Sequence, residues 1–201
     1  MKARQSYFST DFKPRAKHGS DVRKGRRKLS RPIYPGKALH LTLRSTKAKN
    51  NHSLLHSNHR DRVRTQVMKM AARFNIRIHQ YANSGNHLHF LIQMQSHSPR
   101  SHSRKSIQDF IRAVSASVAQ LVTGARRGRP FGKFWDDLAF TRIVSRGRDF
   151  VNTCFYVLRN RLEADGLMEY LPRGMKRSEK GKGRSGPLIF DLRKFGDGLE
   201  A

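Results

Sequence analysis

The stretch HLHFLIQM, residues 87–94, decides the fold that we expect for this chain. Successive side chains of a β-strand point to opposite faces of its sheet. One face of this strand would carry Leu88, Phe90, Ile92 and Met94. The opposite face would carry His87, His89, Leu91 and Gln93. Such a strand fits the centre of a sheet that has one face packed against helices and one face available for chemistry.

Regular periods on both sides of this strand predict the remaining elements. Alternating apolar residues indicate further strands at about 39–43, 76–81 and 134–144. Helical spacing indicates helices at about 55–74, from the capping box at Ser106 to about 123, and at about 148–164. The order matches an α+β fold of the ferredoxin-like (split βαβ) type, an antiparallel sheet with an added C-terminal helix. In that plan the strands at 39–43 and 87–94 are central neighbours, and two helices cover one face of the sheet.

The charge of the chain predicts a polyanionic partner. Its 201 residues include 42 Lys and Arg against 14 Asp and Glu, a formal net charge of +28. We favour nucleic acid over a membrane, because no segment pairs a basic face with an exposed apolar one. The single cysteine, Cys154, excludes a disulfide framework and a cysteine-based zinc site. Without a signal-like or membrane-spanning segment in the sequence, we expect a cytoplasmic, nucleoid-associated protein.

Charge and composition also predict three regions. Residues 1–37 carry a net charge of +10, contain three prolines and show no regular period, which indicates a disordered basic arm. Residues 171–201 carry +4 and form a second basic tail, with one short strand expected at 188–190. Subtracting both leaves +14 for a core domain at 38–170. We expect the two tails to strengthen DNA binding without sequence preference.

The two histidines are candidate metal ligands. His87 and His89 are separated by about 7 Å of extended backbone and share a face, so their imidazoles could bind one cation. By the same alternation of side chains along a strand, His40 should lie on this face, where it could support a metal ligand or bind phosphate. In a chain with ten histidines a chance His-x-His pair is common, so the pair also fits an ordinary solvated strand face.

A tyrosine in the last predicted helix is the candidate nucleophile. On a helical wheel Tyr156 falls on a polar face, within about 60° of Asp149, Asn152, Thr153 and Asn160. The apolar stripe expected to anchor this helix consists of Val151, Phe155, Leu158 and Leu162. A core tyrosine is therefore the weaker interpretation. Asn160, one turn after the tyrosine, could supply an amide oxygen as a third metal ligand, or could simply be a surface amide near the helix end.

These residue types suit attack on a phosphodiester. A free phenol with a pKa of about 10 is only about one part in a thousand ionised at neutral pH. A divalent cation could polarise the phosphate and stabilise the departing 3′ oxygen. In-line attack would leave a 5′-phosphotyrosine and a free 3′-OH, from which strands can be rejoined.

Four segments resemble one known family. The segment Asn86-His87-Leu88-His89-Phe90-Leu91-Ile92 is similar to the His-hydrophobe-His signature of the HUH single-tyrosine transposases. Tyr156-Val157-Leu158-Arg159-Asn160 resembles their tyrosine helix, and the likeness is strongest to the REP-associated tyrosine transposases. The stretches at 39–44 and 132–135 also resemble family segments, in the same order. The resemblance spans roughly residues 36–168.

The resemblance implies a specific activity and set of roles. It implies a ferredoxin-like nuclease, monomeric or homodimeric, that cleaves and rejoins single-stranded DNA near hairpins with Mg²⁺ or Mn²⁺. His87, His89 and Asn160 would be the metal ligands, and Tyr156 the nucleophile. The residues that we expect to bind nucleic acid are His40, Arg44, Arg126, Arg127, Arg129, Lys133 and Arg159.

Two other functions fit parts of the sequence. A catalytically inactive or domesticated descendant could bind single-stranded DNA or RNA, with Tyr81, Phe90 and Trp135 as possible stacking groups. A basic structural protein, such as a ribosome-associated one, would give the histidines no function. Competent residue types at all four expected catalytic positions favour an active enzyme.

Overall fold

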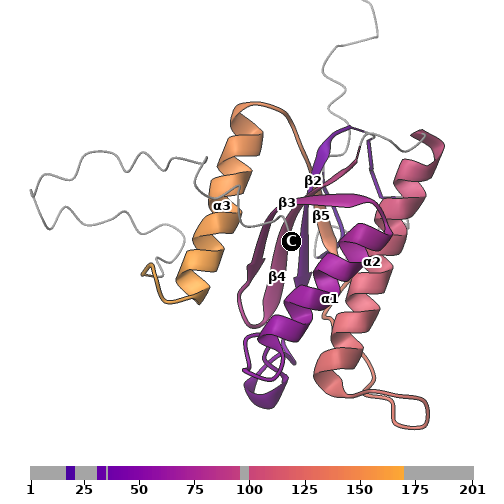
Figure 1. Cartoon of the computed structure of the whole chain (residues 1–201), viewed down its shortest axis with the longest axis vertical. Helices are drawn as coiled ribbons and strands as arrows, with labels where there is room; N and C mark the ends of the chain where they lie inside the picture. Colours follow the sequence, from indigo (N-terminus) through magenta and orange to yellow (C-terminus); the bar gives the residue numbers. More distant parts are fainter. Residues whose placement is uncertain (1–16, 21–30, 35, 96–99, 170–201) are drawn as a thin grey trace, which may run out of the picture. The chain divides into compact units, whose positions relative to one another are not determined.

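The computed structural model of the chain describes residues 17–20, 31–34, 36–95 and 100–169. Its strands are β1 (Lys17–His18), β2 (Ala38–Arg44), β3 (Ile76–Asn83), β4 (His87–Met94) and β5 (Phe140–Val144). Its helices are α1 (Arg60–Arg73), α2 (Arg100–Thr123) and α3 (Arg148–Ala164), with a short 3₁₀ turn η2 (Asn50–His52). Figure 1 shows α1 and α2 on one side of the sheet and α3 on the other.

The strands form one antiparallel sheet in the order β1-β5-β2-β4-β3. Without β1, this is the strand order of the split βαβ plan, so the α+β prediction is confirmed. The predicted central neighbours β2 and β4 pair directly, with Leu41 opposite Phe90 and Thr42 opposite His89. This register decides which side chains of the two strands share a face.

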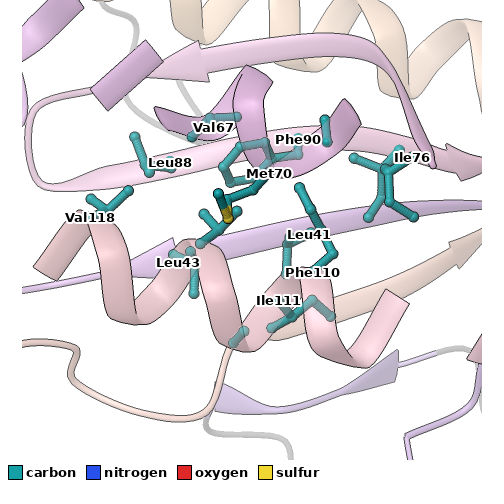
Figure 2. Close-up of a cluster of buried hydrophobic side chains, with 14 of the residues drawn as sticks. Leu41, Leu43, Val67, Met70, Ile76, Leu88, Phe90, Phe110, Ile111 and Val118 are labelled. Atoms are coloured by element: carbon teal, nitrogen blue, oxygen red, sulfur yellow. The ribbon is translucent and has the colours of Figure 1, made fainter. Parts of the chain in front are cut away.

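The main core lies between the sheet and helices α1 and α2 (Figure 2). Leu88, Phe90 and Ile92 of β4 are fully buried there, which confirms the face predicted for them. Phe110 of α2 meets Phe90 edge to face, with 6.5 Å between the ring centroids. Phe90 is therefore unavailable as a stacking surface for bases. The same holds for Tyr81, whose ring packs 5.4 Å from that of Phe90 and whose pKa is raised by burial.

Three predicted boundaries were wrong. Helix α1 begins at Arg60 rather than near 55. Helix α2 begins at Arg100, so Ser106 lies within it and is not its cap. The basic residues before Ser106 are good helix formers and extend the helix past the capping motif. Strand β5 begins at Phe140 rather than near 134, because the preceding stretch forms loop contacts with the residues that follow β2. Ser45 donates to the Phe134 carbonyl, and Thr46 donates to Asp136.

The predicted disordered arm contains ordered residues. Lys17–His18 pairs with β5 as an edge strand, and His18 is buried, so the prediction for 1–37 was wrong at these positions. The exposed edge of β5 offers unpaired backbone groups, which β1 satisfies in spite of its basic neighbours. Residues 1–16 and 21–30 and the tail 171–201, with its expected strand at 188–190, lie outside the described residues. Within the described part of the chain, no helix is long and apolar enough to cross a membrane.

The attachment of β1 depends on a glycine. Gly19 has a φ of +87°, and a Cβ at this position would overlap the Ala139 carbonyl oxygen. We expect Gly19→Ala to lower the free energy of unfolding by about 2–3 kcal/mol, because both strain and overlap oppose β1 docking. Gly36→Ala is the matched control, since Gly36 has a φ of +77° but open space around it, and should cost about 1 kcal/mol. Urea unfolding measures both, and equal losses would show that β1 does not dock as described.

Candidate active site

Helix α3 covers the face of the sheet that the main core leaves open (Figure 1). Its Phe150 and Cys154 pack against a small second cluster of Ala38, Leu91 and Val144. Thr153 and Val157 of the helix are also buried. The helix bounds agree with the predicted 148–164, and Leu91 occupies the face that strand parity assigned to it.

The face by which α3 packs differs from the prediction. Val151 and Phe155, placed in the anchoring stripe, are 42% and 43% exposed. The open face of the sheet is itself half polar, with His79, His40 and His89 along it. The helix therefore turns its mixed face inward, and Phe150 meets His79 edge to face at 5.0 Å. This rotation carries Tyr156 toward the histidines.

The structure brings the tyrosine and the histidines together. The Tyr156 ring centroid lies 5.4 Å from that of His89 and 5.6 Å from that of His40, and both contacts are edge to face. His87 and His89 are 4.7 Å apart by the same measure. Tyr156 is 37% exposed, so its phenol lies at the surface end of this cluster. Residues about seventy positions apart in sequence thus share one site.

The buried ring of His89 is positioned by contacts of its Nδ1. Its Nδ1 lies 3.1 Å from Thr42 Oγ1 and 3.4 Å from His40 Nε2, and the His40 ring stacks on it with 13° between the planes. A neutral His89 that donates from Nδ1 to Thr42 carries its lone pair on Nε2, the form that a metal requires. Thr42 was not among the predicted site residues, although its place opposite His89 follows once the β2–β4 register is known.

His87 is oriented by its neighbour in sequence. Its Nδ1 donates to the Asn86 side-chain oxygen, which can only accept, so the lone pair of the neutral ring is on Nε2. Burial, and then the positive charge of Arg44, lower the pKa of His87 below its usual value. Arg44 is its cross-strand partner in the pairing of β2 with β4. A neutral imidazole with a free lone pair is the form able to bind a cation.

His40 is neutral and buried. Desolvation, followed by the nearby Arg142, lowers its pKa to about 4, and the side chain is only 8% exposed. An uncharged, covered imidazole is a weak phosphate ligand. Of the two roles that the sequence left open, its contact with His89 favours the supporting one.

Sequence reasoning missed a cluster that ties α3 to β5. Arg142, which pairs with His40 in the sheet, donates from Nη1 to both Asp149 carboxylate oxygens at 2.9 and 3.1 Å. Its Nη2 donates to Thr153 Oγ1 at 2.8 Å, one turn before Tyr156. Burial raises the pKa of Asp149, but the Ser145 N–H and Arg142 outweigh it and lower the pKa overall. The sequence signal was available, because Asp149 and Thr153 lie on the tyrosine face of the wheel.

Asn160, the third predicted metal ligand, makes its side-chain hydrogen bond within α3 and not with the histidines. Its Nδ2 donates to the Tyr156 carbonyl oxygen at 2.7 Å, which leaves Oδ1 as the group that could bind a cation. Among the described residues, no three His, Cys, Asp or Glu side chains form a metal-binding group. A cation here would therefore need the two imidazoles completed by an amide, water or a substrate oxygen. Imidazole nitrogens of His87 and His89 are ligand types that fit such a cation.

The residues predicted to bind nucleic acid lie in separate parts of the structure. Arg44 is exposed beside His87 and makes only a loose 3.8 Å ion pair with Asp136. Arg159 is paired with Glu163 at 2.7 Å. The remaining four lie on the exposed connection that follows α2, and they are Arg126, Arg127, Arg129 and Lys133. In this connection the Arg126 and Arg129 backbones pair with each other as a small hairpin.

Comparison with known proteins identifies the fold. No model of a known protein family matches the chain, and neither does any curated protein. Its structure is similar to that of a REP-associated tyrosine transposase bound to a REP hairpin, at 15% identity and a TM-score of 0.50. That likeness covers 71% of this chain and 76% of the other. A transposase candidate from Deinococcus radiodurans matches at 14% identity and a TM-score of 0.38, over 67% of this chain and 97% of its own. The chain therefore has the fold of the REP-associated tyrosine transposase.

Proposed function

We propose that this protein is a metal-dependent nuclease and strand transferase that acts on single-stranded DNA beside hairpins. One observation carries the proposal, the contact of the Tyr156 ring with His89 and His40. A partly exposed phenol in contact with a pair of imidazoles has the components of a metal-assisted nucleophile. The transposase that shares this fold supports a role in transposition or DNA recombination.

In this proposal the two imidazoles hold the cation. His87 and His89 would bind it through Nε2, because Asn86 and Thr42 engage their Nδ1 atoms. Asn160 would complete the site through Oδ1. A bound Mg²⁺ or Mn²⁺ supplies charge that polarises the scissile phosphate. His40 holds the His89 ring in place. The low pKa of His40 keeps its own imidazole uncharged at neutral pH.

Tyr156 would be the nucleophile. Its oxygen forms a bond to phosphorus as the bond from phosphorus to the 3′ oxygen of the preceding nucleotide breaks. The phenolic proton passes to solvent, which the partly exposed side chain can reach, and the departing 3′ oxygen takes up a proton. The products are a 5′-phosphotyrosine and a free 3′-OH. Attack by a 3′-OH on this linkage reverses the step and joins strands.

The charge distribution supports a hairpin substrate. Arg44 provides a largely unpaired cation next to His87, where the backbone of a strand entering the site would pass. The exposed connection at 126–133 adds four cations, and Phe131 within it packs near His52 and Lys47 of the segment that follows β2. Phosphate contacts of this kind position a nucleic acid without reading its sequence. The similar transposase is itself bound to a REP hairpin.

A polarity-resolved adduct assay tests the proposal. A hairpin oligonucleotide with a single-stranded flank is labelled at either its 5′ or its 3′ end and incubated with the protein and Mn²⁺. We expect a denaturation-resistant protein–DNA adduct that carries the 3′ label, because the tyrosine keeps the 5′ phosphate of the downstream fragment. EDTA should abolish it. A DNA-binding protein without activity would give only a salt-sensitive mobility shift. An adduct that carries the 5′ label, or one that survives EDTA, would contradict the mechanism.

A further inference from the structure

A pocket lies beside α2, which packs on the side of the sheet away from Tyr156. It has a volume of about 620 Å³ and is an open pocket between α2 and the segment that leads into β5. Its walls include three cationic side chains, Arg31, Arg112 and Lys133, and the indole of Trp135. The volume is in the range of pockets that hold small ligands. None of the chemistry proposed for Tyr156 uses this pocket.

The indole of Trp135 is a fixed wall. Its Nε1 donates to the Ser115 carbonyl oxygen of α2 at 2.8 Å, and its ring meets Phe134 at 4.9 Å between centroids. The ring is partly exposed, unlike the buried Phe90. The nearby Leu138 also lines the pocket and is 68% exposed, so it adds apolar surface that a ligand can cover. A held aromatic ring beside an exposed apolar side chain is suited to receive a planar base.

Arg31 brings a positive charge into the pocket, whose lining also contains the exposed acidic residue Asp137. Its Nη1 donates to two neutral oxygens, the Ala139 carbonyl at 2.8 Å and Thr141 Oγ1 at 2.6 Å. Among the described residues it forms no ion pair. Burial lowers its pKa to about 10, so the guanidinium stays charged at neutral pH although it is partly desolvated. Such a cation is stabilised by an anion, and a phosphate matches the guanidinium fork.

We propose that this pocket binds one unpaired nucleotide of a DNA strand, with the base against Trp135 and a phosphate at Arg31. Lys133 adds a second positive charge to the lining, and Arg112 adds a third that is paired with Asp109 at 3.2 Å. The choice of DNA rests on the proposed function, whereas the recognition of base and phosphate rests on the pocket. A duplex does not fit, because its bases are stacked on each other and cannot reach the indole.

The protein carries its own reporter for this pocket. Trp135 is the only tryptophan of the chain, so intrinsic indole fluorescence reports on this site alone. The full chain with Tyr156→Phe, in which strand cleavage cannot interfere, is titrated in EDTA with a single-stranded DNA oligonucleotide. We expect quenching that saturates. A perfect duplex of equal length should produce little quenching at the same occupancy, which mobility shift measures.

Pocket variants separate this site from general charge effects. Ala116→Phe places a ring in the pocket from an exposed position on α2. Arg112→Ala removes one of its cations. Each should weaken the binding that quenches the indole about tenfold, the effect of one stacking or charged contact. Lys105→Ala is the control, since it removes an equal charge from an exposed position on the same helix outside the pocket.

The outcomes distinguish this inference from the proposed function. Equal affinity for the Arg112→Ala, Ala116→Phe and Lys105→Ala variants would overturn the pocket, even if wild-type protein forms the tyrosine adduct. Equal quenching by duplex would overturn it as well, and equal quenching by RNA of the same sequence would overturn the choice of DNA. Selective quenching by single-stranded DNA supports the pocket whether or not an adduct forms, since the assay uses neither Tyr156 nor a metal.

Discussion

Tyr156→Phe is expected to abolish the covalent protein–DNA adduct and to leave DNA affinity within about twofold. The substitution removes one oxygen and keeps the ring, so the contacts with His89 and His40 persist. Binding through cationic side chains is unchanged, because no charge is altered. Loss of a nucleophile commonly costs about 10⁴-fold or more in rate, which places the variant below detection in a gel assay. Adduct yield and mobility shift, measured on the same samples, provide the test.

Tyr34 offers a matched control for this substitution. It is 40% exposed, close to the 37% of Tyr156, and Lys37 lies over its ring. Tyr34→Phe should keep the adduct at the wild-type level, which excludes a general effect of removing a surface phenol. An adduct that persists in Tyr156→Phe and disappears in Tyr34→Phe would move the nucleophile to the other residue. An adduct in both variants would remove tyrosine 156 from the mechanism.

The parts of this site that sequence could predict are those set by local periods. Strand alternation alone places His87 and His89 on the face opposite Leu88 and Phe90, and the buried core confirms this assignment. The same alternation places His40 on the face of His89 once β2 and β4 are known to be neighbours. The helical period also gives the bounds of α3 correctly.

The parts that sequence could not predict depend on contacts between distant segments. The predicted orientation of α3 about its axis was wrong, because the prediction assumed that the most hydrophobic side of the helix packs inward. This helix instead packs on a polar sheet face that accepts Thr153 and leaves Phe155 outside. Arg142 becomes a site residue only through the β2–β5 register, which has no local signature. Strand β1 lies in a basic, proline-containing segment, so its pairing to the edge of β5 runs against its composition.

Removing both candidate ligands is expected to eliminate two properties at once. In the His87→Ala/His89→Ala variant we expect adduct formation to fall by about 10³-fold or more, because the phosphate would lose its electrostatic stabilisation. The second property does not depend on activity. If the two imidazoles bind Mn²⁺ in the folded chain only, wild-type protein should gain about 2.7 kcal/mol of stability at a metal concentration of one hundred times the Kd. The double variant should gain none, as thermal unfolding with and without Mn²⁺ measures.

A second histidine pair makes this test specific. His56 and His59 lie 5.5 Å apart by ring centroids, close to the 4.7 Å between His87 and His89, but they belong to the segment at the start of α1. The His56→Ala/His59→Ala variant should keep both the adduct and the Mn²⁺ stabilisation. Equal stabilisation of all three proteins by Mn²⁺ would place the cation elsewhere, for example on unrelated surface groups. Loss of the adduct from the site variant without loss of Mn²⁺ stabilisation would make the imidazoles positioning groups for Tyr156 and not ligands, since the two measurements report on different properties of the same rings.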